Sequence, residues 1–183
     1  FLLSASPERF LCKKGDLLIS QPMKGTIRRD LDDPIHDAKL KETLQQSKKD
    51  QMENVMVVDL VRNDLSRVCL QGSVQVDELF GIYSFATVHQ MISSVTGRVK
   101  AEFNFDTILQ NTFPMGSMTG APKFTAMQLI DKYEKVSRNL YSGSIGYFDP
   151  NGDFDFNVVI RTLLYNENKK YLSYSTGSAI TLD

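Results

Sequence analysis

The sequence of 183 residues contains no tryptophan, two cysteines and two histidines, and its formal net charge is only −1. A near-neutral chain without a basic tract gives no indication of nucleic-acid binding. Its longest apolar runs, such as residues 55–58, are far shorter than the roughly 20 residues that span a membrane. The N-terminus lacks the basic and then apolar order of a secretory signal. We therefore expect a cytoplasmic protein without nucleic-acid or membrane partners.

The two cysteines, Cys12 and Cys69, do not have the C-x-x-C spacing of a metal or redox site, so we expect both to be reduced and partly buried. With 42% hydrophobic and 23% charged residues, the composition is that of an ordinary globular domain with one core. The first residues start within a strand pattern, and residues 180–183 add no closing element. We expect a single domain over residues 1–183, cut from a longer polypeptide at both ends.

The hydrophobic pattern predicts strands at both ends of the chain and helices in two blocks. Asp33 and Pro34 are typical of a helix start, with proline in the first turn and an acidic residue at the positive end of the helix dipole. The chain lacks the regular strand–helix–strand alternation that is typical of a parallel sheet, so the pattern favours an α+β fold with antiparallel sheet. The predicted strands cover residues 1–5, 8–13, 16–21, 72–83, 88–99, 143–148, 154–165 and 170–176. One helix is predicted to begin near residue 34. Three further helices are predicted over residues 48–67, 105–113 and 123–135.

A lysine sits at an unusual corner in the segment QPMKGTIRR, residues 21–29. Pro22 fixes its own φ, Gly25 allows backbone that a β-carbon forbids, and Thr26 adds a hydroxyl. Lys24 is therefore held at a strand end beside rigid backbone. It is a surface charge, an anchor for a phosphate or carboxylate, or a nucleophile if its amine is neutral.

Two acidic residues, Asp50 and Glu53, are three apart on a predicted helix and share one face. The apolar run that follows them places this face at the edge of the core. Such a pair suits Mg²⁺, which takes one or two carboxylates and keeps several waters. The alternative is a solvated face with the neighbouring lysines.

Other candidates are weaker when taken alone. Glu8 precedes Lys24 by one hairpin, so adjacent antiparallel strands bring the two together. His89 is a general base or a satisfied structural residue. Arg161 follows an apolar strand and binds either a carboxylate ligand or an internal acid. The loop of residues 116–123 is a weak anion site, residues 58–67 form a helix-end ion-pair network, and Gly177 with Ser178 is either a turn or backbone that a ligand approaches.

Taken together and in this order, the segments resemble the chorismate-utilising enzymes, which include anthranilate, aminodeoxychorismate, isochorismate and salicylate synthases. The resemblance covers essentially the whole chain. The matching segments are SPERF at 6–10, PMKGT at 22–26, Glu53 with VDLVRND at 58–64, GSMTGAPK at 116–123, YSGSIGY at 141–147 and IRT at 160–162.

The resemblance implies roles for the candidates. Anthranilate synthases are similar to Pro-Ile-Ala-Gly-Thr where this chain has Lys24, whereas aminodeoxychorismate synthases carry the lysine as a nucleophile towards chorismate. By the same resemblance, Glu8 is the acid and base, and Glu53 with Asp50 binds Mg²⁺. The remaining implied site residues hold or line chorismate: Tyr141, Arg161, Ser117, Gly177, Ser178 and Thr26, with His89 at the position of a histidine linked to pyruvate elimination.

The implied fold is two large, mostly antiparallel sheets packed as a sandwich with helices outside and the active site between them. The implied partner is a glutamine amidotransferase subunit that supplies ammonia. Further Mg²⁺ carboxylates of the family fall after Asp183. Two alternatives follow: an anthranilate, isochorismate or salicylate synthase, or a catalytically incomplete fragment that binds a ligand or a partner.

Overall fold

The computed structural model of the chain describes residues 1–180; the last three residues of the predicted domain lie outside them. Helices and strands follow one another much as the sequence predicts. Their bounds are β1 Leu2–Ser4, β2 Arg9–Lys14, β3 Leu17–Gln21, β4 Met23–Arg28, α1 Pro34–Gln46, α2 Lys48–Val68, β5 Gln75–Ser84, β6 Val88–Arg98, α3 Phe105–Thr112, the 3₁₀ turn η1 Gly116–Met118, α4 Lys123–Tyr133, β7 Ser144–Phe148, β8 Phe154–Val158, β9 Thr162–Asn166 and β10 Tyr171–Tyr174.

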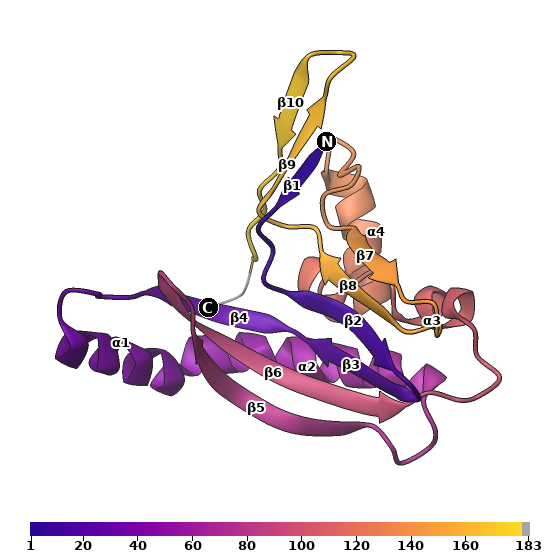
Figure 1. Cartoon of the computed structure of the whole chain (residues 1–183), viewed down its shortest axis with the longest axis horizontal. Helices are drawn as coiled ribbons and strands as arrows, with labels where there is room; N and C mark the ends of the chain where they lie inside the picture. The colour runs from indigo at the N-terminus through magenta and orange to yellow at the C-terminus, as the bar shows by residue number, and fades with distance from the viewer. Residues whose placement is uncertain (181–183) are drawn as a thin grey trace.

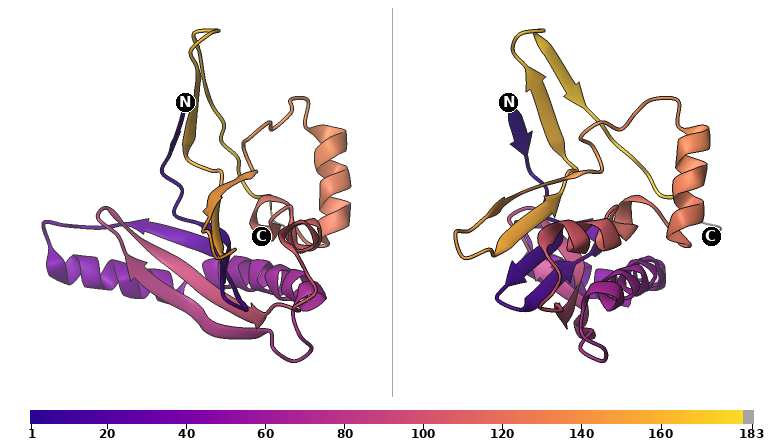
Figure 2. Two further views of the ribbon diagram at one scale, coloured as in Figure 1. Left: turned by 45° about the vertical axis from the view of Figure 1, so that its right-hand side comes forward. Right: turned by 90° about the vertical axis from the view of Figure 1, so that its right-hand side faces the viewer.

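The strands form two antiparallel sheets (Figure 1). The larger sheet has seven strands in the order β4-β6-β3-β2-β8-β7, with β5 paired to β6. The smaller sheet contains β1, β9 and β10, and it projects away from the larger one (Figure 2). The predicted α+β class with antiparallel sheets is confirmed, and the second sheet has three strands within the described residues.

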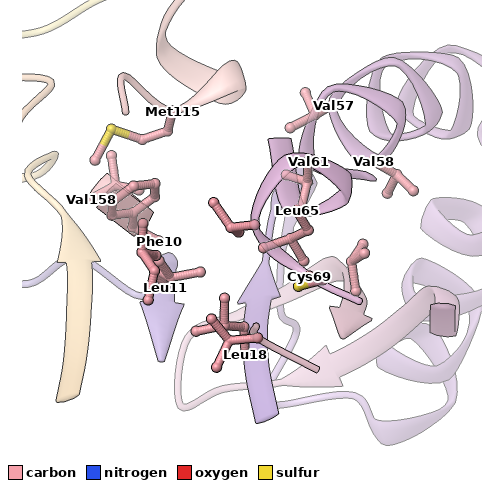
Figure 3. Close-up of a cluster of buried hydrophobic side chains, with 14 of the residues drawn as sticks. Phe10, Leu11, Leu18, Val57, Val58, Val61, Leu65, Cys69, Met115 and Val158 are labelled. Atoms are coloured by element: carbon pink, nitrogen blue, oxygen red, sulfur yellow. The ribbon is translucent and has the colours of Figure 1, made fainter. Parts of the chain in front are cut away.

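Helices α1 and α2 run along one face of the large sheet (Figure 1). The Ser47 hydroxyl accepts a hydrogen bond from the Asp50 N–H and caps α2. Val57, Val61 and Leu65 of α2 are buried in the core that the strands complete with Phe10, Leu11, Leu18 and Val158 (Figure 3). Burial of each such side chain contributes about 1.5–3 kcal/mol, so α2 is firmly attached to the sheet.

A second apolar contact joins α3 to the β7–β8 hairpin. Phe105 of α3 lies edge-on to Phe148 and Phe154, with ring centroids 4.7 and 5.2 Å apart, and stacks on Phe156 at 5.4 Å. Cys12 and Cys69 are both buried, and neither is in a disulfide in the structure. No helix among residues 1–180 is long and apolar enough to cross a membrane.

The structure corrects two predicted elements. The single strand predicted over residues 154–165 is broken, because Arg161 has a φ of +50° and the chain passes from β8 in the large sheet to β9 in the small one. The sequence pattern places Lys24 just after a strand, but it lies inside β4, a strand that the pattern does not predict. The polar residues and the glycine of this segment hide its strand pattern.

Candidate active site

Lys24 lies in an irregular stretch of β4. Met23 pairs with Ile92 of β6 and Thr26 pairs with Gln90, so β4 has one more residue than β6 between these pairs. Such a bulge redirects side chains and is common beside active sites. Lys24 is half-buried, and its amine has no hydrogen bond or ion pair among the described residues. The bulge therefore presents an amine that is free to act.

Gly25 completes the bulge and must be glycine for two reasons. Its φ is +88°, a left-handed conformation that β-carbons disfavour. A β-carbon there would also lie 2.9 Å from Asp50 Cβ and 3.1 Å from Asp50 Oδ1. The lysine corner thus packs directly against the acidic face of α2.

Glu8 is the second charged group of this site. Its side chain is buried, and this burial raises the pKa of the carboxyl from 4.5 to about 6, although contacts from the Ser117 hydroxyl, the positive charges of Lys24 and Arg161, and the Met23 backbone act in the opposite direction. The two cations therefore lie close to Glu8. A carboxyl with a pKa near 6 can both donate and accept a proton around neutral pH.

Ser117 reaches Glu8 from the turn η1. Gly116 before it is buried, and a β-carbon at Gly116 would lie 2.8 Å from Leu60 Cβ, so the turn sits directly on α2. The Ser117 hydroxyl is buried and lacks a well-aligned hydrogen-bond partner within residues 1–180, although it is near enough to Glu8 to lower the pKa of that carboxyl. It is therefore available to a ligand.

A small cavity adjoins these groups. Glu8, Ser117 and Asp64 are among its lining residues, and its volume of about 20 Å³ holds roughly one water molecule. The cavity thus has room for a water molecule beside the Glu8 carboxyl.

Tyr141 and Gly177 meet at the other side of the site. A β-carbon at Gly177 would lie only 2.3 Å from Tyr141 Oη, so the phenol touches the Gly177 backbone. Arg161 lies in the break between β8 and β9, and its side chain is exposed while its charge acts on Glu8. Ser178 is exposed, and its hydroxyl contacts only the neighbouring Ala179 carbonyl oxygen among the described residues. The structure thus brings Tyr141 to Gly177 and Arg161 to Glu8, and the Ser178 hydroxyl has no hydrogen bond to either pair among the described residues.

His89 does not join this group. It is buried, its Nε2 lies 3.0 Å from Asp37 Oδ1, and its Nδ1 lies 2.8 Å from Ser84 Oγ. Arg29 pairs with the same Asp37, and this pairing is the main reason why the Asp37 pKa falls to about 2. His89 therefore belongs to a buried network that ties α1 to β5 and β6.

The next residue, Gln90, is not among the candidates that the sequence suggests. Neighbouring strand residues face opposite sides of a sheet, and the Gln90 side-chain N–H group donates to Thr26 Oγ1 over 3.1 Å. Gln90 is 2% exposed, and its amide oxygen has no partner within the described residues. The alternation of side chains along β6, together with the lysine corner beside it, is the signal that could identify Gln90.

Asp50 and Glu53 occupy the first two turns of α2, both partly buried. The Ser47 hydroxyl bonds Asp50 Oδ2, so one oxygen of this carboxylate is already held in place. Within residues 1–180, no group of three or more acidic, histidine or cysteine side chains converges as a metal site. Two neighbouring carboxylates fit part of a Mg²⁺ shell, which water or ligand oxygens would complete.

The site therefore combines an amine without a partner among the described residues, a buried carboxyl with a raised pKa, and a nearby arginine that can bind an anionic ligand. Amine and carboxyl lie together between the sheet, α2 and η1. This set can perform nucleophilic attack, proton transfer and carboxylate binding.

Over residues 1–183 the sequence matches the family described as chorismate binding enzyme. The chain belongs to this family. The family predicted from the sequence motifs is confirmed. Aminodeoxychorismate synthase of Arabidopsis thaliana is 48% identical over 98% of the chain, and component 1 of that enzyme from Escherichia coli is 44% identical over 96%.

The chain spans only part of these relatives, 19% of the plant protein and 39% of the bacterial one. Among solved structures, anthranilate synthase component I of Streptococcus pneumoniae superposes with a TM-score of 0.77 at 33% identity, over 88% of this chain and 35% of that one. The isochorismate synthase MenF of Escherichia coli superposes equally well, with a TM-score of 0.77 over 88% of this chain and 36% of that one. At 23% identity it shows the shared fold of the chorismate-binding enzymes.

Proposed function

We propose that this chorismate-binding chain is the core of an aminodeoxychorismate synthase, which replaces the C4 hydroxyl of chorismate with an amino group. The observation that carries the proposal is the lysine bulge: Lys24 has a free amine beside the buried carboxyl of Glu8. The names of the relatives that are 42–48% identical support the same activity. The full protein would act in para-aminobenzoate and folate biosynthesis.

In the proposed reaction, the Lys24 ammonium first gives a proton to the Glu8 carboxylate, and the resulting neutral amine attacks C2 of chorismate. The ring double bond shifts, and the C4 hydroxyl leaves as water after it takes the proton of Glu8. Ammonia then attacks C4, the double bond shifts back, and the bond to Lys24 breaks. Glu8 accepts a proton from the incoming nitrogen, and the lysine leaves as an amine. The product is 4-amino-4-deoxychorismate.

Substrate carboxylates have cationic and polar partners in this scheme. Arg161 and Tyr141 hold the enolpyruvyl carboxylate, and Arg161 suits it because a guanidinium binds a carboxylate through two parallel bonds. Ser117, Thr26 and the backbone at Gly177 line the rest of the pocket. Ser178 and His89 are also predicted to contact chorismate. Their hydrogen bonds in the structure do not support this, because the Ser178 hydroxyl bonds the Ala179 carbonyl oxygen and His89 bonds Asp37.

We further propose that Asp50 and Glu53 contribute to a Mg²⁺ site. The ion would neutralise the ring carboxylate of chorismate and withdraw charge from the ring. Asp50 lies against Gly25, so a ligand of the ion would be next to the nucleophile. Isothermal titration with Mg²⁺ alone tests this without any turnover: Glu53→Gln should weaken binding, and unchanged heat would remove Glu53 from the site.

The proposed source of ammonia is a glutamine amidotransferase partner, for which the component 1 names of the bacterial relatives give general support. The buried free thiols agree with a reducing, cytoplasmic setting.

The test is the intact mass of the full protein after incubation with chorismate and Mg²⁺ without ammonia. A covalent adduct that maps to Lys24 is expected in the wild type and in Lys13→Ala, a control lysine on the same sheet. Lys24→Ala should give none. Anthranilate fluorescence on addition of ammonium, without an adduct, would establish an anthranilate synthase instead. If neither an adduct nor anthranilate fluorescence is seen, the remaining possibilities are an isochorismate-type enzyme and a fragment that only binds a ligand or a partner.

A further inference from the structure

Two proposed chorismate contacts lie on either side of α4, a helix whose apolar side chains are mostly exposed. Ser117 comes before α4 and Tyr141 comes after it, yet no residue of α4 is buried among residues 1–180. Since hydrophobic packing fixes most helices in place, α4 by itself is a poor spacer. Something else must hold the two contacts at a constant separation.

The Arg138 side chain bridges the two segments. Its Nη1 donates to the Met118 carbonyl oxygen over 2.7 Å and to Ser142 Oγ over 3.0 Å. Met118 directly follows Ser117, and Ser142 directly follows Tyr141. One nitrogen atom therefore bonds the chain neighbours of both proposed contacts.

The rest of the guanidinium is held from the end of α4. Arg138 Nε donates to Glu134 Oε2 over 2.8 Å, and Nη2 donates to Glu134 Oε1 over 2.6 Å. This two-bond pairing orients the plane of the guanidinium and aims Nη1 at its two other acceptors. Three segments, namely η1, the end of α4 and the loop after it, are joined through one side chain.

Ser142, the residue that receives this bond, is itself buried and in a left-handed conformation. Ser142 has a φ of +66°, is 8% exposed, and donates its N–H to the Val159 carbonyl oxygen. A left-handed non-glycine residue persists only where its surroundings fix it. The Arg138 bond to Ser142 Oγ is one of the contacts that do so, next to Tyr141.

We propose that Arg138 is a positioning residue that sets the distance between Ser117 and Tyr141 and thereby the fit of chorismate. The proposal rests on the proposed function only in taking chorismate as the ligand. Lysine cannot replace Arg138, because a single ammonium cannot bond the Glu134 carboxylate in a planar fork while it also reaches two acceptors on other segments.

The experiment measures chorismate consumption by the full protein, whatever product forms. In Arg138→Lys, the KM for chorismate should rise about tenfold with a smaller change in kcat, because ground-state contacts are displaced rather than the reacting groups. Arg98→Ala, which removes another arginine from an exposed ion pair with Asp16, should leave KM and kcat unchanged. Thermal unfolding of each variant shows whether the fold is retained.

A double-mutant cycle separates positioning from a general structural effect. If Arg138 acts through Tyr141, Arg138→Lys should raise KM by no more than about threefold once Tyr141 is already Phe. Equal effects in both backgrounds, or an unchanged KM in Arg138→Lys, would overturn the inference. Product identity is decided separately, so formation of anthranilate would overturn the proposed function and leave the KM comparison valid.

Discussion

The Asp50 side chain lies directly against the backbone of Gly25, so that a β-carbon on Gly25 would come within 2.9 Å of Asp50 Cβ. Strand β4, which carries Lys24, and the start of α2, which carries Asp50, therefore pack so closely that no further atom fits between them at Gly25. This contact couples the position of the amine to the position of the acidic face.

Gly25→Ala should destabilise the chain through both strain and collision. The left-handed φ costs about 1–2 kcal/mol for a residue with a β-carbon, and displacement of Asp50 adds to that. Gly15→Ala is the matched control, because Gly15 has a φ of +61° but no atom lies within 4 Å of the position that its β-carbon would take. Urea unfolding should show a larger loss for Gly25→Ala than for Gly15→Ala, and Asp50→Ala should restore part of it. Equal losses of stability in Gly25→Ala and Gly15→Ala would mean that Asp50 moves away from the new β-carbon without lowering stability.

Glu8 should make the stability of the chain depend on pH. Its pKa is about 6 in the folded state and about 4.5 without burial, so between these values the folded state binds more protons than the unfolded one. Stability therefore falls as pH rises through this window, by about 2 kcal/mol in total. Glu8→Gln removes this loss, so the variant should be more stable than the wild type at pH 8 by about that amount and similar to it at pH 4. Urea unfolding at both pH values measures the difference, and parallel profiles would refute the raised pKa.

Most of the elements can be predicted from the sequence because their signals are local. Proline near the start of α1, the Asp149–Gly152 turn between β7 and β8, and the apolar periodicity of α2 each depend on a few neighbouring residues. The motifs, in turn, predict the family. Side chains from distant segments, such as Glu8 and Ser117, do come together as those motifs imply.

The failures arise where tertiary contacts decide the local conformation. β4 escapes prediction because Gly25 and Lys24 interrupt its alternation, although pairing with β6 makes it a strand. The break at Arg161 cannot be predicted because the apolar strand-forming residues before it favour a continuous strand and give no sign of its positive φ. The structural role of His89 cannot be inferred from its identity, because the partner that holds it, Asp37, is more than fifty residues away in sequence.

Among the ion pairs that hold residues 116–123, the pair between Lys123 and Asp64 should be the one whose loss lowers stability most. Both side chains are largely buried, Lys123 Nζ also donates to the Thr112 carbonyl oxygen over 3.1 Å, and burial already raises the Asp64 pKa against the charge of Lys123. Lys123→Met leaves a buried carboxylate without its cation and should cost about 3–5 kcal/mol at pH 8. Because the unpaired Asp64 would be protonated more easily, the cost should shrink at pH 5. The exposed Arg62–Asp59 pair gives the control, since Arg62→Met should cost under about 1 kcal/mol.

The double variant Lys123→Met with Asp64→Leu decides whether the loss comes from the unpaired charge or from the missing bridge. Replacement of both partners by apolar groups removes the buried charge, and such replacements are often neutral or stabilising. Chemical denaturation should therefore find the double variant more stable than Lys123→Met alone. If both variants lose the same stability, the bond from Lys123 to the Thr112 carbonyl, and not the charge of Asp64, holds the loop that carries Ser117 against α2.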